Sequence, residues 1–349
     1  KLLTAGLVLD VISGWGLAPC ALFVMVISVF WGALAGIKTV IWTDFLLFGL
    51  FALGAGFALI YMLLGLERSL PDTIIWLDEQ AKLVLFDFDT DPEKRYTIWA
   101  GVIGAIGLSI AQGSTQGTWQ RVKACRSVGD AQKAFDFAAL FYVMHLVILG
   151  VGLALVAFYG ERGLPDEIAL ELASSPDRIF PHFIATELPV GISGIFIAAI
   201  FAAAISTLDS ALAESSDLTV NHIYSRWRPA ETETHYLRAS RAFMLIWGLI
   251  FFALALFFGK YSAEGLLDLT FKLPNYLYGA IFGSIILARF GIGTFPTIIL
   301  GFALACLLVV WMSSAGIAFF YWCPVSGLSM VALVWALNPK TPEWRGVVD

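Results

Sequence analysis

The sequence predicts an all-α protein that crosses a membrane many times. Of its 349 residues, 59% are hydrophobic and 14% are charged, whereas soluble domains carry about 25% charged residues. Apolar runs of the length that a helix needs to cross the hydrocarbon core, about 20 residues, recur along the chain. These runs are too long for barrel strands and do not alternate in polarity. We therefore expect a polytopic bundle of helices.

About nine full spans are expected, preceded by a partial helix at residues 1–12. The spans cover residues 17–36, 38–65, 98–120, 134–159, 190–221, 236–259, 265–290, 294–314 and 316–337. The apolar run at 2–12 is too short to span, and the chain starts at Lys1 without Met. We therefore expect the chain to begin inside a helix, and residues 1–349 to form a single membrane domain.

Basic residues in short loops predict the orientation. The loop at 121–133 and the region at 226–241 each carry four Lys or Arg residues, and two crossings separate them. Cytoplasmic loops are enriched in Lys and Arg, so both segments are expected in the cytoplasm. The opposite loops, 66–97 and 160–189, are longer and rich in acidic residues.

Patterns typical of enzymes are missing from the sequence. The four Cys and four His residues have no spacing typical of a disulfide framework or a metal site. There is no phosphate-binding glycine loop after a strand, no pair of catalytic carboxylates and no nucleophile elbow. We expect neither an enzyme nor a partner made of nucleic acid; the oligomeric state is not indicated.

Polar residues inside spans are costly and mark candidate functional positions. One stripe runs along the span at 190–221, with Asp209 at its edge beside Ser206. At about 100° per residue, the stripe consists of Ala203, Ser206, Thr207, Ser210, Glu214 and Asp217. Its oxygens could hold a cation. Periodicity alone slightly favours the alternative, a packing face whose hydroxyls bond back to their own helix.

Two further polar positions lie on other spans. Asp44 is one to two turns inside its span and either offers a carboxylate to an ion or points to the interface. The segment from Gln112 to Gln116, which includes Ser114, holds glycine, hydroxyl and amide residues without aliphatics. Such a helix unwinds easily and lines a cavity when it does so at membrane depth; the alternative is the frayed end of a helix.

The span at 265–290 contains Pro274, which breaks or kinks a helix. Asn275 and Tyr276 follow it and are candidates for lining a solute path. Asp268 and Lys272 are four residues apart and could form a surface ion pair.

Three ordered segments resemble those of a known family. Residues 198–210 read Ala-Ala-Ile-Phe-Ala-Ala-Ala-Ile-Ser-Thr-Leu-Asp-Ser, and residues 35–44 read Ala-Gly-Ile-Lys-Thr-Val-Ile-Trp-Thr-Asp. The third is Gly113-x-x-Gln116-x-x-x-Gln120-Arg121. Together they resemble the sodium/solute symporter family, which includes sodium–glucose, sodium–proline and sodium–monocarboxylate or vitamin carriers.

The resemblance implies a LeuT-type fold of two inverted five-helix repeats, with core helices one and two absent from this chain. It also implies a sodium site at Ala203, Ser206 and Thr207, whose other half lies on the missing core helix one. Some members hold a second sodium ion at positions that match Asp44, Asp209 and Ser210. Asp209 departs from the hydroxyl residue of those members, which puts ligation at this second site in question.

The function that the resemblance implies is sodium-coupled symport of a small organic solute by alternating access, with Na⁺ as coupling ion, in the plasma (inner) membrane. The solute would lie near Gln112, Ser114, Gln116, Asn275 and Tyr276. Positions that contact sugar in sugar carriers are here Leu108 and Ala111, so a monocarboxylate, an amino acid or a vitamin-like solute is favoured. The alternatives are a symporter-like sensor of a signalling protein and a passive channel.

Overall fold

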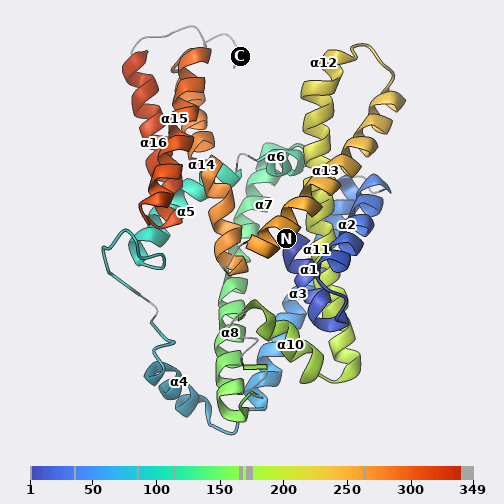
Figure 1. The fold of residues 1–349 in the computed structure, drawn as a ribbon, viewed down its shortest axis with the longest axis vertical. Coiled ribbons are helices and arrows are strands. Elements are labelled where there is room, and N and C mark those ends of the chain that lie inside the picture. Colours follow the sequence, from blue (N-terminus) through green and yellow to red (C-terminus); the bar gives the residue numbers. More distant parts are fainter. Residues whose placement is uncertain are drawn as a thin grey trace. The chain divides into compact units, whose positions relative to one another are not determined.

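The computed structural model describes residues 2–34, 37–84, 86–113, 115–164, 168–169, 176–261 and 265–338. Every regular element in these ranges is a helix (Figure 1). They fall into two compact units: residues 1–82 with 125–266, and residues 83–124 with 267–349. Each unit combines segments that lie far apart in the sequence.

Seven helical stretches within the described ranges are long and apolar enough to cross a membrane, which is typical of an integral multi-pass membrane protein. They are Leu17–Leu34, Trp42–Leu64, Val128–Arg162, Val190–Trp227, Glu233–Lys260, Phe295–Ser314 and Phe319–Leu337. A bent pair, Ile98–Gly113 with Gln116–Lys123, makes an eighth if it is one span. The predicted span at 265–290 forms a helix, Leu266–Phe290, that carries three charged residues and is not among these stretches.

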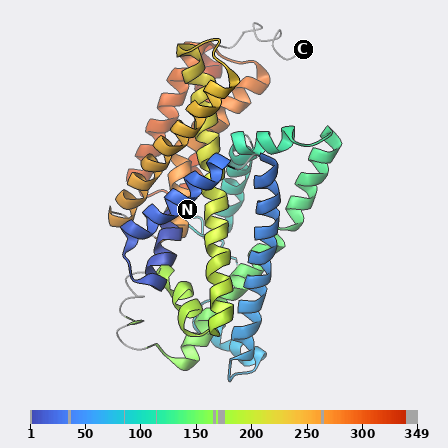
Figure 2. The same cartoon turned by 90° about the vertical axis from the view of Figure 1, so that its right-hand side faces the viewer.

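The first unit is organised around a 30-residue helix, α11 (Val190–Thr219). This helix packs against α2 (Leu17–Leu34), α3 (Ile37–Leu64) and α13 (Glu233–Tyr261). In Figure 2, α11 runs upright in yellow-green beside α3 in blue. The remaining elements of the unit are α1 (Leu2–Ser13), α4 (Leu70–Glu79), α7 (Val128–Leu140), α8 (Val143–Arg162), η1 (Pro176–Arg178), α10 (Ile179–Thr186), η2 (Val220–Tyr224) and α12 (Ser225–Trp227).

Two apolar clusters fix α11 in this unit. Near its start, Phe196 belongs to a cluster with Phe158 of α8 and Phe183 of α10, both fully buried. Further along, Leu208 and Leu212 pack with residues of α1, α2 and α13. The polar stripe of α11 therefore lies on a helix that is held by buried apolar contacts near its start and along the stripe itself.

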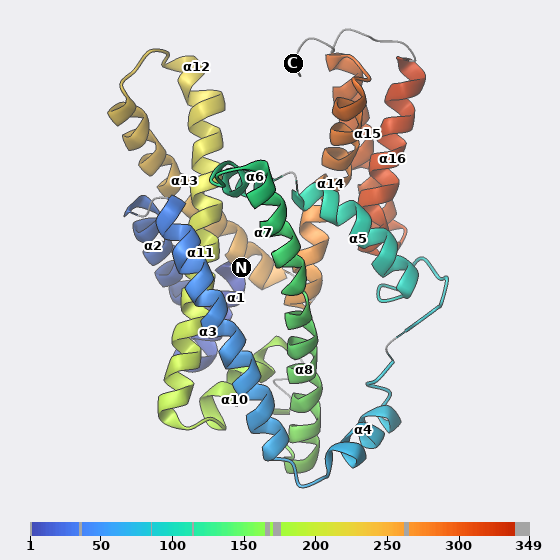
Figure 3. The same ribbon diagram turned by 180° about the vertical axis from the view of Figure 1, so that it is seen from behind.

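The second unit contains α5 (Ile98–Gly113), α6 (Gln116–Lys123), α15 (Phe295–Ser314), η3 (Phe319–Tyr321), α16 (Trp322–Leu337) and α14 (Leu266–Phe290) from Leu267 onward (Figure 3). Two glycines let α14 approach α16 closely. A Cβ atom at Gly279 would overlap Ser326, and one at Gly283 would lie 2.8 Å from the carbonyl oxygen of Gly327. Small residues of this kind allow close helix packing in membranes.

Candidate functional site

The polar stripe of α11 is turned toward its helical neighbours. Ser206 and Asp209 are buried, with 8% and 1% of their surface exposed. Three alanines, at positions 202–204, precede them and keep the helix narrow. Ser206 and Asp209 are three residues apart and therefore lie on neighbouring positions of one face.

Asp44 of α3 contacts this stripe. The Ser206 hydroxyl donates a hydrogen bond to Asp44 Oδ1, across 162 residues of sequence. Asp44 lies three residues into the membrane span that begins at Trp42. Sequence reasoning assigned Ser206 and Asp44 to two different ion sites, and the structure joins them through one bond.

Two other hydroxyls of the stripe bond back to their own helix. Thr207 Oγ1 donates to the Ala203 carbonyl over 2.8 Å, and Ser210 Oγ donates to the Ser206 carbonyl over 3.1 Å. Back-bonding is the pattern that the packing alternative predicted. The carbonyls of Ala203 and Ser206 lie inside a continuous helix and accept these hydroxyls in addition to the helical amides. The hydroxyl oxygens of Thr207 and Ser210 only donate in these bonds, so they keep their own lone pairs as acceptor capacity for a cation.

Asp209 lies against α2 at a glycine. A Cβ atom placed on Gly32 would come within 3.3 Å of Asp209 Cβ and 3.6 Å of its Cα. The close approach of α2 and α11 therefore depends on the missing side chain at Gly32. Sequence reasoning did not single out Gly32, whose only signal is a glycine inside an apolar run.

The predicted break in the span at 98–120 is present. Helix α5 ends at Gly113, α6 begins at Gln116, and the two helices differ in direction by 57°. Thr115 caps α6 by accepting from the Thr118 amide, and the Thr118 hydroxyl donates to the Gln112 carbonyl over 3.2 Å. The Gln112 side chain is exposed and Gln116 is half-buried, while Ser114 lies outside the described residues.

The candidates after Pro274 have different surroundings. Asn275 is fully buried; its Nδ2 donates to the Phe271 carbonyl over 2.8 Å, and its Oδ1 has no hydrogen-bond partner among the described residues. Tyr276 is turned toward α15 and α16, where its hydroxyl lies 3.0 Å from Ser313 Oγ and its ring packs against Trp322. Tyr276 thus contacts its neighbours through both its hydroxyl and its ring, whereas the Asn275 side chain has an acceptor oxygen without a partner among the described residues.

The comparison with known protein families identifies the chain. The sequence model of the sodium:solute symporter family matches residues 1–292. The chain belongs to this family. Membership confirms the family that the three ordered segments resemble.

Individual relatives are distant. The human sodium/iodide cotransporter is 25% identical over 294 residues, which cover 81% of this chain and 44% of the relative. Sodium-coupled monocarboxylate transporter 2 of Danio rerio is 27% identical over 213 residues, which cover 59% of this chain and 33% of the relative. The chain thus spans less than half the length of these curated relatives.

A solved structure shows the same fold. The chain is similar to a Na⁺-coupled sialic acid symporter in a substrate-bound outward-open state, with a TM-score of 0.81 and 21% identity. The match covers 97% of this chain and 70% of the other. The predicted LeuT-type fold is confirmed by this likeness.

Proposed function

We propose that the protein carries out sodium-coupled symport of a small organic solute by alternating access. The observation that carries the proposal is the hydrogen bond from Ser206 to Asp44, next to the oxygens of Ala203 and Thr207. A carboxylate inside a membrane span is costly and marks an ion path by default. Membership of the sodium:solute symporter family supports Na⁺ as the ion.

The chemistry of the stripe suits Na⁺. Hard cations prefer oxygen ligands. Ala203, Ser206 and Thr207 would supply a carbonyl and two hydroxyl oxygens to one ion. Asp44, Asp209 and Ser210 would supply two carboxylates and a hydroxyl oxygen to a second ion. Ser206 would serve both groups, because rotation of its hydroxyl away from Asp44 frees a carboxylate oxygen and turns a lone pair toward an ion.

The solute would bind near the interruption between α5 and α6 and near Asn275. An interrupted helix at membrane depth exposes backbone carbonyl and amide groups that can bind a polar solute, and Asn275 offers a buried carbonyl oxygen. Gln112, Ser114, Gln116 and Tyr276 remain proposed members of the same site. A monocarboxylate, an amino acid or a vitamin-like solute is proposed on the sequence, because Leu108 and Ala111 stand at the sugar-contacting positions. The names of the similar proteins include monocarboxylate, iodide and sialic acid, so iodide and sialic acid are added as candidates.

Coupling would follow from differential affinity. An ion that binds one conformation more tightly than the other shifts the equilibrium by that difference and no more. The contact between Asp44 on α3 and Ser206 on α11 joins two helices that would have to keep their spacing for ions to bind. We further propose that the protein lies in the plasma membrane, with loops 121–133 and 226–241 in the cytoplasm.

Solute accumulation in proteoliposomes tests the proposal. Purified protein would be given an inward sodium gradient and a panel of labelled monocarboxylates, amino acids, vitamins, sugars, sialic acid and iodide. We expect saturable accumulation of one solute class, which disappears with an equal potassium gradient or when an ionophore dissipates the sodium gradient. Flux that does not depend on sodium would indicate a passive channel, and no flux with any solute would contradict symport.

A further inference from the structure

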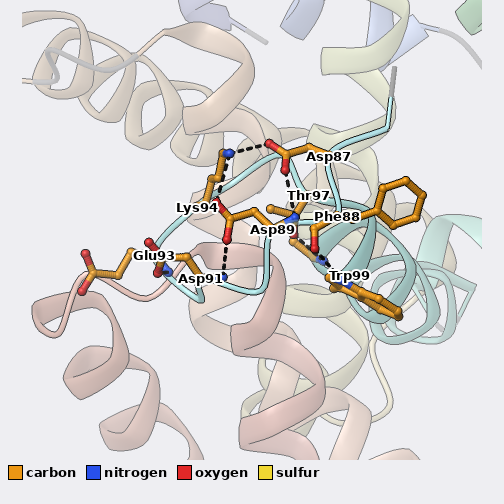
Figure 4. A network of polar contacts seen from close by, with 9 residues as sticks. Asp87, Phe88, Asp89, Asp91, Glu93, Lys94, Thr97 and Trp99 are labelled. Atoms are coloured by element: carbon orange, nitrogen blue, oxygen red, sulfur yellow. Dashed lines mark hydrogen bonds and ion pairs between the residues drawn. The ribbon is translucent and has the colours of Figure 1, made fainter. Parts of the chain in front are cut away.

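The acidic loop at residues 86–97 is held by hydrogen bonds between its aspartate side chains and its own backbone. The carboxylates of Asp87, Asp89 and Asp91 each accept a hydrogen bond from the backbone amide two residues further on, over 2.9, 3.1 and 2.9 Å. Figure 4 shows these three bonds in succession. The side chains therefore hold their own backbone in a fixed series of turns.

Further contacts tie the same loop together and to α5. Lys94 Nζ lies 2.6 Å from Asp87 Oδ2 and 3.3 Å from Asp89 Oδ2 (Figure 4). The Asp87 carbonyl accepts from the Ile98 amide over 2.8 Å, and the Phe88 carbonyl accepts from Trp99 Nε1 over 3.2 Å. The aspartates are thus occupied with contacts inside the loop, and both ends of the loop are tied to its own residues or to α5.

The loop contacts the beginning of α14. Arg95 Nη1 lies 2.6 Å from Asp268 Oδ2, and the Tyr96 hydroxyl donates to Asp268 Oδ1, so both carboxylate oxygens are engaged. On another side of the loop, the Pro92 carbonyl accepts from the Ala318 amide over 2.9 Å, at the connection between α15 and α16. The loop therefore links α14 to that connection within one unit.

Asp268 is placed where such a contact can control α14. It lies in the first turn of the helix, where a negative charge is favoured by the helix dipole. Six residues later, Pro274 has no N–H to donate to the preceding turn, and such positions allow a helix to bend. Asn275 is seven residues after Asp268, which is about two turns along the same face.

We propose that Arg95 and Tyr96 are positioning residues that fix the segment of α14 before Pro274, so that bending of this helix is confined to Pro274 and Asn275 keeps its position. The inference rests on the proposed function for its effect on transport. Loop 86–97 acts as the brace, Asp268 is its attachment point, and residues 267–273 are the segment that it holds.

Hydrogen exchange tests the brace without any need for transport. In Arg95→Ala and Asp268→Asn, we expect amide exchange of residues 267–273 to rise roughly fivefold, the effect of losing one net hydrogen bond, while residues 277–290 do not change. The matched control is Arg162→Ala, which removes a comparable pair with Glu187 at 3.3 Å and should leave residues 267–273 unchanged. The charge swap Arg95→Asp with Asp268→Arg should restore slow exchange.

Uptake kinetics supply the second readout. Arg95→Ala should raise the KM for solute several-fold while the half-saturating sodium concentration stays the same. If a charge variant raises amide exchange throughout the protein, Tyr96→Phe is measured instead, because it removes a single hydroxyl. Amide exchange of residues 267–273 in this variant then decides whether the loop holds the segment. Unchanged exchange at 267–273 in all three single variants would overturn the brace. Faster local exchange in a protein with no sodium-driven flux would support the brace and refute the proposed function.

Discussion

The Ser206 hydroxyl of α11 donates a hydrogen bond to the Asp44 carboxylate of α3. This bond joins two membrane helices at half-buried to buried positions. A charge-assisted hydrogen bond is about twice as strong as a neutral one, so the pair fixes the spacing of the two helices. A cation that takes up Ser206 or Asp44 as a ligand must change this bond, which links ion binding to helix packing.

Asp44→Asn should weaken sodium activation. The substitution keeps the shape and one acceptor but removes the negative charge, and contacts to charged groups contribute about 1.5–3 kcal/mol. We expect the half-saturating sodium concentration for uptake to rise roughly tenfold to a hundredfold, since about 1.4 kcal/mol corresponds to a factor of ten. Asp72→Asn, at an exposed position of α4, is the control; sodium activation that is equal in both variants would argue against a role for Asp44.

Asp209→Asn should change the steepness of sodium dependence. If Asp209 is a ligand to a second ion, removal of its charge takes one ion out of the coupled cycle, because a buried carboxylate offsets the charge of a bound cation. We expect a lower Hill coefficient for sodium with uptake retained, measured over a range of sodium concentrations. A Hill coefficient equal to that of the wild type would leave Asp209 with a packing role only.

Gly32→Leu should destabilise the packing of α2 on α11. Because a Cβ atom at Gly32 already approaches Asp209 Cβ to 3.3 Å, a larger side chain forces the helices apart, and overpacking costs about 1–3 kcal/mol. The melting temperature in detergent should fall by several degrees. Gly56→Leu is the matched control, since a Cβ atom at Gly56 meets no atom within 4 Å; equal melting temperatures for the two variants would contradict the packing.

The loop at 86–97 should be most ordered between two pH limits. Its bond to Lys94 lowers the pKa of Asp87 below 3.8, and the bond from the Asp91 amide lowers that of Asp89. Their stabilising contribution is therefore complete above about pH 3.8 and is lost as the pH falls through the lowered values. The bonds to Asp87 and Asp89 raise the pKa of Lys94 above 10.5, so its contribution is lost as the pH rises through that raised value.

A spin label at Glu93→Cys, in a background without the four native cysteines, reports this order. Its mobility should be low between the two limits and should rise beyond each of them. A label at Gln80→Cys, an exposed position at the end of α4, should show no such change. In Lys94→Ala the mobility at Glu93→Cys should already be high at neutral pH; a restricted label there would contradict the assigned role of Lys94.

The two sides of the membrane should differ in thiol labelling. Cys125 lies in the basic loop after α6, which the distribution of Lys and Arg places in the cytoplasm. In a variant that keeps only Cys125, an impermeant maleimide should react only after the membrane is permeabilised. A variant that keeps only Glu93→Cys should react in intact cells, and the opposite pattern would reverse the topology.

Much of the architecture could be predicted from the sequence because each membrane-spanning helix needs an apolar run of about 20 residues, which is easily recognised. The interruption between Gly113 and Gln116 was also predictable, since it follows from local composition. Short helices such as α4 and α10 were not, because segments of 10 and 8 residues carry no membrane signal.

Side-chain partners were harder to predict than helices. Asp268 has Lys272 four residues away, which suggested a local pair. The structure adds a partner for Asp268 that the sequence did not indicate, Arg95, 173 residues earlier. The contact of Gly32 with Asp209 is equally remote. Such contacts are set by how helices pack, and a single sequence contains no signal for them.

Uptake of radiolabelled sodium, stimulated by solute, tests the central claim most directly. Wild-type protein in proteoliposomes would be compared with a Ser206→Ala, Thr207→Ala double variant and with Ser329→Ala, which removes an exposed hydroxyl that bonds back to its own helix. The account predicts saturable, solute-dependent sodium entry in the wild type and in Ser329→Ala, and its loss in the double variant. Sodium entry that is equal in all three proteins, or absent from all of them with every solute, would contradict it.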